Sequence, residues 1–125
     1  MNESLRIVIV DDNDEFRSEL SQYIKHQPRV KIVGEGKDGR EAMSLAQTLR
    51  PDVILLDISM PGISGIEAAK KIKELSPFSK IIFITIHEEK TYHTLASMIG
   101  VDGFICKSNL KQELPSILKT MGKVV

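Results

Sequence analysis

The chain has 125 residues, the size of one domain, and 42% of them are hydrophobic, which suffices for a single buried core. Seventeen basic and seventeen acidic residues cancel to a formal net charge of zero, so direct DNA binding by this chain is disfavoured. A lone cysteine, an N-terminus without a secretory pattern and no apolar stretch near the ~20 residues of a membrane span predict a cytoplasmic protein that does not enter a membrane.

Short apolar runs alternate along the chain with segments of helical spacing. Strands are predicted at 5–10, 30–35, 53–56, 81–85 and 103–106. The second and fifth are shorter or interrupted by polar residues, which is typical of strands at a sheet edge. Helices are predicted around Phe16 to Ile24, Ala42 to Leu49, Ile66 to Leu75, Leu95 to Ile99 and Leu114 to Met121. This alternation predicts an α/β single domain of flavodoxin-like (βα)5 type, whose five-stranded parallel sheet has the order 2-1-3-4-5 and helices on both faces.

Some local features bear on where helices begin and end. Asp14 is expected to cap the first helix, and Gly100 and Gly122 are expected to follow the ends of the fourth and fifth helices. Pro115 lies beyond the first turn of the last predicted helix, where it removes a hydrogen bond. We therefore expect that helix to start late or to bend.

Polar residues follow the predicted strands at the edge where such folds place their functional crevice. Asp11-Asp12 end the first strand, Asp57 the third and Thr85 the fourth, and Lys107 directly follows the fifth. Carboxylates this close repel one another, and a hard divalent cation such as Mg²⁺, bound together with phosphate oxygens, relieves the repulsion. The set predicts a site for a metal and a phosphate.

Each of these residues also has a purely structural interpretation. Asp11-Asp12 would serve as helix caps and Asp57 as a turn residue, and Thr85 and Lys107 are uninformative singly. Their joint occurrence at the ends of four strands favours a functional site. Other chemistry-bearing residues are assigned to the surface or the core: His26 and His93 to the surface, Cys106 to the core as an inert thiol, and Lys70, Lys71 and Lys73 to a solvated helix face.

Four sequence stretches together resemble a known family. These are VIVDDN at 8–13, VILLDISMPGISG at 53–65, IIFIT at 81–85 and DGFICK at 102–107. They are similar to the receiver domain of bacterial two-component response regulators, and the resemblance runs from about residue 5 to 121. It implies that residues 1–125 are one receiver domain with no output domain in this stretch of sequence.

The resemblance assigns roles to the residues at the predicted edge. It implies that Asp57 is the phosphoacceptor, with Mg²⁺ or alternatively Mn²⁺ bound by Asp57, directly by Asp12, through water by Asp11 and by the backbone carbonyl of Ser59. Thr85 and Lys107 would contact the phosphoryl group. Asp57 would attack phosphorus in line to form an acyl phosphate, while Mg²⁺ and Lys107 neutralise charge on the equatorial oxygens.

The resemblance also implies a switch and partners. Thr85 would move toward the phosphoryl group and Phe104 would rotate behind it. A sensor histidine kinase or a phosphotransfer protein would be the phosphodonor. The output face would comprise the fourth helix, fifth strand and fifth helix, where Tyr92, Met98 and the residues around Pro115 would meet a partner or a second copy. The first and fifth helices are the alternative dimer surface. Ser59 and His87 are expected to flank the path of a hydrolytic water.

Many receivers have proline after the lysine, where this chain has Ser108. Together with Thr85-Ile86-His87 and Asp102-Gly103-Phe104, this Lys-Ser pair most resembles regulators with a LuxR-type helix-turn-helix output, hence transcription regulators. The chain is then either a stand-alone receiver or part of a longer regulator, and it is not a conventional turnover enzyme. Three alternatives remain. A flavodoxin-like small-molecule binder is disfavoured by the acidic loop after the first strand, and a phosphatase with an aspartyl nucleophile is disfavoured because Ser59 stands where such enzymes typically have a second aspartate. The third alternative is a degenerate receiver that only docks partners.

Overall fold

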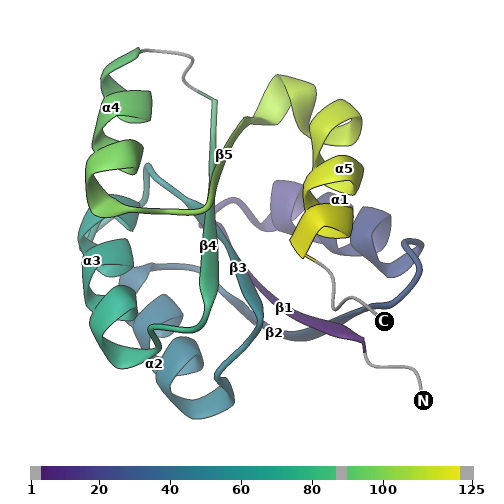
Figure 1. The fold of residues 1–125 in the computed structure, drawn as a ribbon, viewed down its shortest axis with the longest axis horizontal. Coiled ribbons are helices and arrows are strands. Elements are labelled where there is room, and N and C mark those ends of the chain that lie inside the picture. Colours follow the sequence, from purple (N-terminus) through teal and green to yellow (C-terminus); the bar gives the residue numbers. More distant parts are fainter. Residues whose placement is uncertain (1–3, 87–89, 122–125) are drawn as a thin grey trace.

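The structure is a computed structural model and describes residues 4–86 and 90–121. Strands and helices alternate throughout (Figure 1). Their bounds are β1 Leu5–Val10, α1 Asp14–Lys25, β2 Val30–Gly36, α2 Gly39–Leu49, β3 Val53–Asp57, α3 Gly65–Leu75, β4 Lys80–Thr85, α4 Lys90–Ile99, β5 Gly103–Cys106, a 3-10 turn Lys107–Asn109 and α5 Leu110–Met121.

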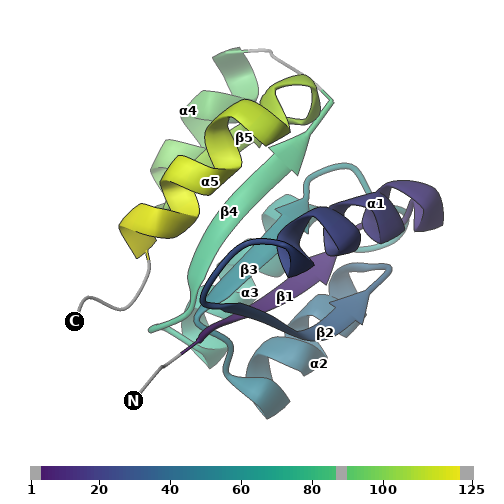
Figure 2. The ribbon, with the colours of Figure 1, turned by 90° about the vertical axis from the view of Figure 1, so that its right-hand side faces the viewer.

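The five strands form one parallel sheet of order β2-β1-β3-β4-β5, as predicted. β2 and β5 are its edges, which explains their lower apolar content. Ile7 pairs with Val53 and Asp57 with Ile84, while β1 and β2 pair with one irregularity between Ile7 and Val8. The arrowheads of the strands point toward the same edge of the sheet (Figure 2), so the residues that follow the strands gather there.

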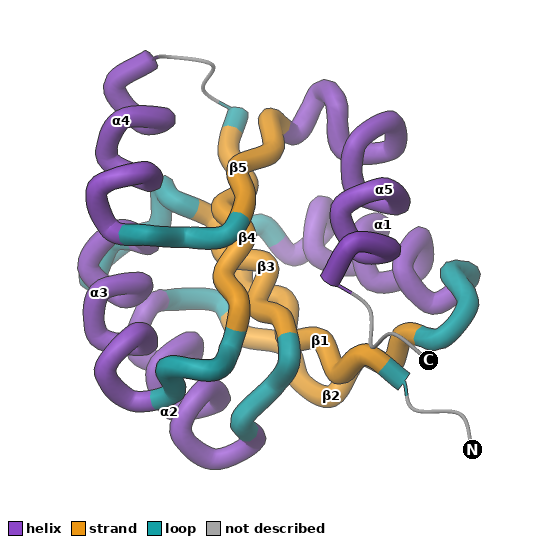
Figure 3. Tube along the Cα trace, in the orientation of Figure 1, coloured by secondary structure: helices purple, strands orange, loops and turns teal. Residues whose placement is uncertain are grey.

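Helices cover both faces of the sheet, with α2, α3 and α4 on one side and α1 and α5 on the other (Figure 3). Successive side chains of a strand point to opposite faces, so β1 supplies Val8 and Val10 to the first layer and Ile7 and Ile9 to the second. Both layers are apolar and buried. The central strands therefore have almost no polar residue before their carboxyl ends, which keeps the chemistry at one edge.

Helix boundaries differ in places from the expectation. Asp14 is not the cap of α1: it is the first helical residue, and the Asn13 side chain accepts the N–H of Phe16 at 2.8 Å. Gly100 follows α4 with φ +83° and donates to the Ala96 carbonyl, as predicted for a glycine at this position. Gly122 lies outside the described residues. No helix in the described part of the chain is long and apolar enough to span a membrane.

The last helix accommodates its proline instead of starting after it. α5 begins at Leu110, five residues ahead of Pro115, so the expectation of a late start is wrong. A proline has no N–H for the carbonyl four residues earlier, which here belongs to Lys111. The Tyr23 hydroxyl of α1 donates to that carbonyl at 3.3 Å. A side chain from the neighbouring helix thus takes the place of the missing backbone donor.

Candidate phosphoacceptor and metal site

Three carboxylates converge at the carboxyl edge of the sheet. Asp11 and Asp12 directly follow β1, and Asp57 is the last residue of β3, the neighbouring strand. One oxygen of each lies within 4.8 Å of the others. Asp11 and Asp57 are buried and Asp12 is exposed, so the cluster opens to solvent on one side. The sequence prediction that these three side chains come together is confirmed by the geometry.

The ammonium group of Lys107, the residue that follows β5, lies against the cluster. Its Nζ lies 2.8 Å from Asp11 Oδ2 and 3.9 Å from Asp57 Oδ2, and only 16% of its side chain is exposed. Asp11 Oδ2 is buried and accepts no aligned hydrogen bond among the described residues, so the ion pair is what compensates its charge. Within the described part of the chain, one ammonium group therefore faces three carboxylates, which leaves an excess of negative charge.

Burial and the excess of negative charge change the pKa of Asp57. Burial of its carboxyl, followed by the negative charge of Asp11, raises the pKa of Asp57 to about 7. The positive charge of Lys107 and the Ser59 N–H, which donates to Asp57 Oδ1 at 3.3 Å, act in the opposite direction. An additional cation at this edge would lower the cost of ionising Asp57.

The other residues that the sequence predicts for the site lie on or just after the neighbouring strands. Thr85 ends β4, next to β3, and is fully buried. Ser59 is exposed two residues beyond Asp57. Phe104 of β5 is half-buried, and its ring centroid lies 3.9 Å from that of His93 on α4. His87, the other expected neighbour of a hydrolytic water, lies outside the described residues.

The structure also shows where the cysteine, two of the histidines and Met98 lie. Cys106 is buried at the end of β5, as expected of a core thiol. His26 and His93 are exposed, although His93 also contacts the Phe104 ring. Met98, expected at the output face, is 78% exposed, and nothing is described of the Tyr92 side chain.

Sequence reasoning missed two residues that shape the loop after β1. The Arg17 guanidinium donates to the backbone carbonyl of Asp11 at 2.7 Å and pairs with Asp14 and Glu35. Phe16 places its ring 4.1 Å from Lys107 Nζ. Apolar spacing placed Phe16 on the apolar face of the first predicted helix, but periodicity carries no signal for a contact with a cation.

Gly65 is a third residue that was missed. A Cβ added there would lie 2.2 Å from the Asp57 carbonyl oxygen and 2.7 Å from Ile58 Cα. Only glycine therefore lets the start of α3 pack directly on the end of β3. The signal was present, because a glycine ends the stretch 53–65.

Comparisons with known proteins agree with this architecture. The sequence profile of the response regulator receiver domain matches residues 7–119. The chain belongs to this family. It is 34% identical over 103 residues to the transcriptional regulatory protein DegU of Brevibacillus brevis, covering 82% of this chain and 44% of that protein. It is 32% identical over 117 residues to the response regulator protein VraR of Staphylococcus saprophyticus, covering 92% and 55%.

Solved receiver structures have the same fold. The response regulator domain of Thermotoga maritima CheB superimposes with a TM-score of 0.85 at 35% identity, covering 95% of this chain and 94% of that one. The receiver domain of the putative regulator NarL from Mycobacterium tuberculosis gives 0.88 at 30% identity, covering 95% and 97%. These relatives place the chain near LuxR and NarL-type regulators, and it spans about half the length of the curated relatives it matches.

Proposed function

We propose that this receiver domain is a phosphorylation switch in which Asp57 accepts a phosphoryl group. The observation that supports the proposal is the convergence of Asp11, Asp12 and Asp57 within 4.8 Å, with Lys107 Nζ at 2.8 Å from Asp11 and 3.9 Å from Asp57. Lys107 Nζ lies closer to Asp11 than to Asp57, so what favours Asp57 as the acceptor is its place at the end of the central strand β3 in a chain of the receiver family.

The donor set fits a hard divalent cation. Carboxylate oxygens are ligands that Mg²⁺ prefers, and among the described residues the buried Asp11 Oδ2 is compensated by the Lys107 ammonium group without an aligned hydrogen bond. Asp11, Asp12 and Asp57, with the Ser59 carbonyl, would hold Mg²⁺ or Mn²⁺. When bound, the metal neutralises carboxylate charge and charge on phosphoryl oxygens.

The residues of the chain then have distinct roles. An oxygen of the ionised Asp57 carboxylate forms a bond to the phosphorus of a phosphohistidine donor. The bond from phosphorus to the imidazole nitrogen of that histidine breaks, and the leaving imidazole takes up a proton. Lys107 stabilises negative charge on the transferred group, and the Thr85 hydroxyl contacts it. In the structure Lys107 is already held at the cluster, so its contribution needs little rearrangement.

The donor and the physiological setting follow from the family. A receiver domain implies a histidine kinase, and we propose such a kinase or a phosphotransfer protein as the direct partner. No conventional enzyme family is indicated, and we propose phosphoryl acceptance with self-catalysed dephosphorylation in place of turnover. Residues 1–125 would act as one cytoplasmic receiver domain, either standing alone or serving a LuxR-type DNA-binding output. The alternative, a degenerate receiver that only docks partners, is disfavoured by the intact cluster.

The signal would pass from Thr85 to Phe104 and onward to α4 and α5. Phe104 has no hydroxyl to fix its rotamer, but its ring stacks on His93 of α4. A change in the position of the Phe104 ring therefore alters a contact with α4 directly. The output face would be α4, β5 and α5, where Met98 is exposed and open to a partner or a second copy; α1 with α5 is the alternative dimer surface.

The proposal is tested by intact mass after incubation with acetyl phosphate and Mg²⁺. We expect wild-type protein to gain one phosphoryl group and Asp57→Asn to gain none. Asp38→Asn is a matched control, because Asp38 caps α2, is not one of the three clustered carboxylates, and is replaced by an equally good cap. A full mass gain by Asp57→Asn would refute the assignment, and wild-type protein that gains no phosphoryl group would favour the degenerate receiver.

A further inference from the structure

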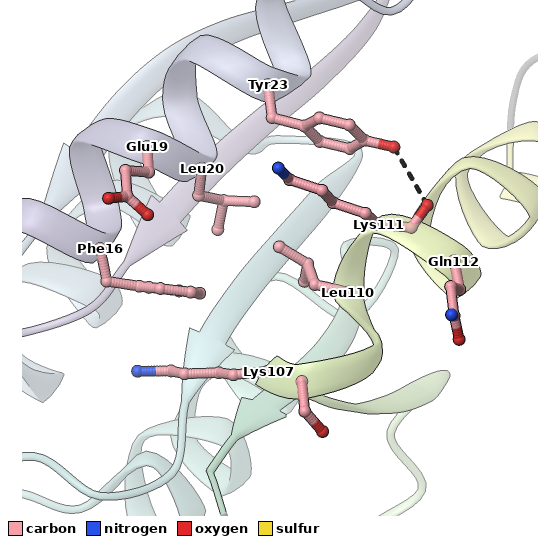
Figure 4. Close-up of a pocket in the computed structure, with 9 residues that line it drawn as sticks. Phe16, Glu19, Leu20, Tyr23, Lys107, Leu110, Lys111 and Gln112 are labelled. Atoms are coloured by element: carbon pink, nitrogen blue, oxygen red, sulfur yellow. Dashed lines mark hydrogen bonds between the residues drawn. The ribbon is translucent and has the colours of Figure 1, made fainter.

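Lys107 contacts an aromatic ring in addition to the carboxylates. Its Nζ lies 4.1 Å from the ring centroid of Phe16, a residue in the first turn of α1. Figure 4 shows the Lys107 side chain running alongside the ring, which is seen edge-on. An ammonium group within about 6 Å of a ring centroid is attracted by the negative face of the ring. Lys107 is thus held by a ring and by two carboxylates at once.

The position of Phe16 is itself fixed by the loop that carries the acidic pair. The Phe16 N–H donates to the Asn13 side chain, and the Asn13 N–H donates to Asp11 Oδ1, each at 2.8 Å. The ring also packs against the buried layer between α1, α5 and the sheet. The ring, the acidic loop and the ammonium group therefore form one connected unit.

We infer that Phe16 is a positioning residue for Lys107. A lysine has a flexible four-carbon stem, so its ammonium group can occupy many other positions in solvent. The ring occupies one side of that group and excludes water there, so that Nζ stays between Asp11 and Asp57. The inference deepens the proposed function, on which it rests, because a fixed Lys107 is useful only if a phosphoryl group is bound next to it.

The surroundings of the Phe16 ring allow substitutions to distinguish a positioning role from a role in core packing. Phe16 and Lys107 both line a groove of about 350 Å³ between α1 and the start of α5, so the ring is only partly enclosed. Leucine at position 16 would preserve apolar packing and helix propensity but provides no ring face. Tyrosine would preserve the ring face. A purely structural role predicts that leucine suffices, whereas a positioning role predicts that an aromatic residue is needed.

The experiment compares Phe16→Leu and Phe16→Tyr with wild type. The first measurement is the rate constant for phosphorylation by acetyl phosphate with Mg²⁺. We expect Phe16→Leu to lower it roughly three- to thirtyfold and Phe16→Tyr to leave it within about twofold of wild type. Phe78→Leu is the control, because Phe78 is 53% exposed and outside the site.

The second measurement is the NMR shift of the Lys107 side-chain methylene protons, which needs no phosphorylation. We expect an upfield ring-current shift in wild type and Phe16→Tyr, and its loss in Phe16→Leu. Wild-type rates in Phe16→Leu, or the absence of the shift in wild type, would overturn the inference. If wild type accepts no phosphoryl group, the proposed function fails, while the Lys107 shift still decides whether Phe16 holds the ammonium group.

Discussion

Among the described residues, Asp57 has the pKa that lies furthest from its ordinary value, because burial and the charge of Asp11 raise it to about 7. In the unfolded chain this carboxyl has a pKa of about 3.9. Between these two values the folded state binds more protons than the unfolded state, so the free energy of unfolding falls as pH rises. The site is therefore destabilising at neutral pH when no cation compensates it.

Asp57→Asn removes that buried charge. We expect the variant to be more stable than wild type at about pH 8 without divalent metal, by on the order of 1–3 kcal/mol, because the raised pKa reports an unfavourable ionised form. Urea unfolding of both proteins from about pH 5 to 8 measures this. Equal pH slopes in the two proteins would mean that Asp57 is not destabilised by its site.

Gly65 is the second residue that the site requires. Its added Cβ would lie 2.2 Å from the Asp57 carbonyl oxygen, a backbone atom that cannot move aside independently. We expect Gly65→Ala to lower the free energy of unfolding by about 1–3 kcal/mol and to slow phosphorylation of Asp57. Gly103→Ala is the control, since its Cβ would meet the Ile82 side chain at 3.3 Å, a much milder contact than the one at Gly65. Equal effects of both substitutions on the phosphorylation rate would contradict this account.

Among the elements, α1 and α5 are joined by a hydrogen bond at the carbonyl that a proline leaves without its helical donor. Pro115 leaves the Lys111 carbonyl without its helical donor, and the Tyr23 hydroxyl supplies one at 3.3 Å (Figure 4). We expect Tyr23→Phe to cost about 0.5–1 kcal/mol of unfolding free energy. In a Pro115→Ala background the cost should shrink, because residue 115 then donates to the carbonyl itself. A double-mutant cycle by denaturant unfolding tests this, and additive effects would exclude the compensation.

The same elements show what could be predicted from the sequence. Strand bounds and sheet order followed from apolar runs, since parallel strands buried on both faces contain few polar residues. The carboxylate cluster followed because strand ends meet at one edge. The cap of α1 and the start of α5 were wrong, because Asn13 and Asp14 are equally good caps and the donor from Tyr23 comes from a distant segment.

At the scale of the whole molecule, metal binding and folding are coupled through the cluster. The cation competes with the proton on Asp57, whose pKa is about 7, so Mg²⁺ affinity should rise from about pH 6 to 8 and then level off. A ligand at 100 times its Kd stabilises the folded state by about 2.7 kcal/mol. Thermal unfolding with and without Mg²⁺ at several pH values measures the effect, with Na⁺ at equal ionic strength as control. Stabilisation by Mg²⁺ that is independent of pH would contradict the role of Asp57 as a ligand.

The most direct test of the central claim is the position of the phosphoryl group. An acyl phosphate on an aspartate is reduced by borohydride to homoserine, which marks the residue that carried it. After treatment with acetyl phosphate and Mg²⁺, peptide mass spectrometry should find homoserine at position 57 alone. Homoserine at position 11 or 12, or at none of the three, would show that Asp57 is not the phosphoacceptor.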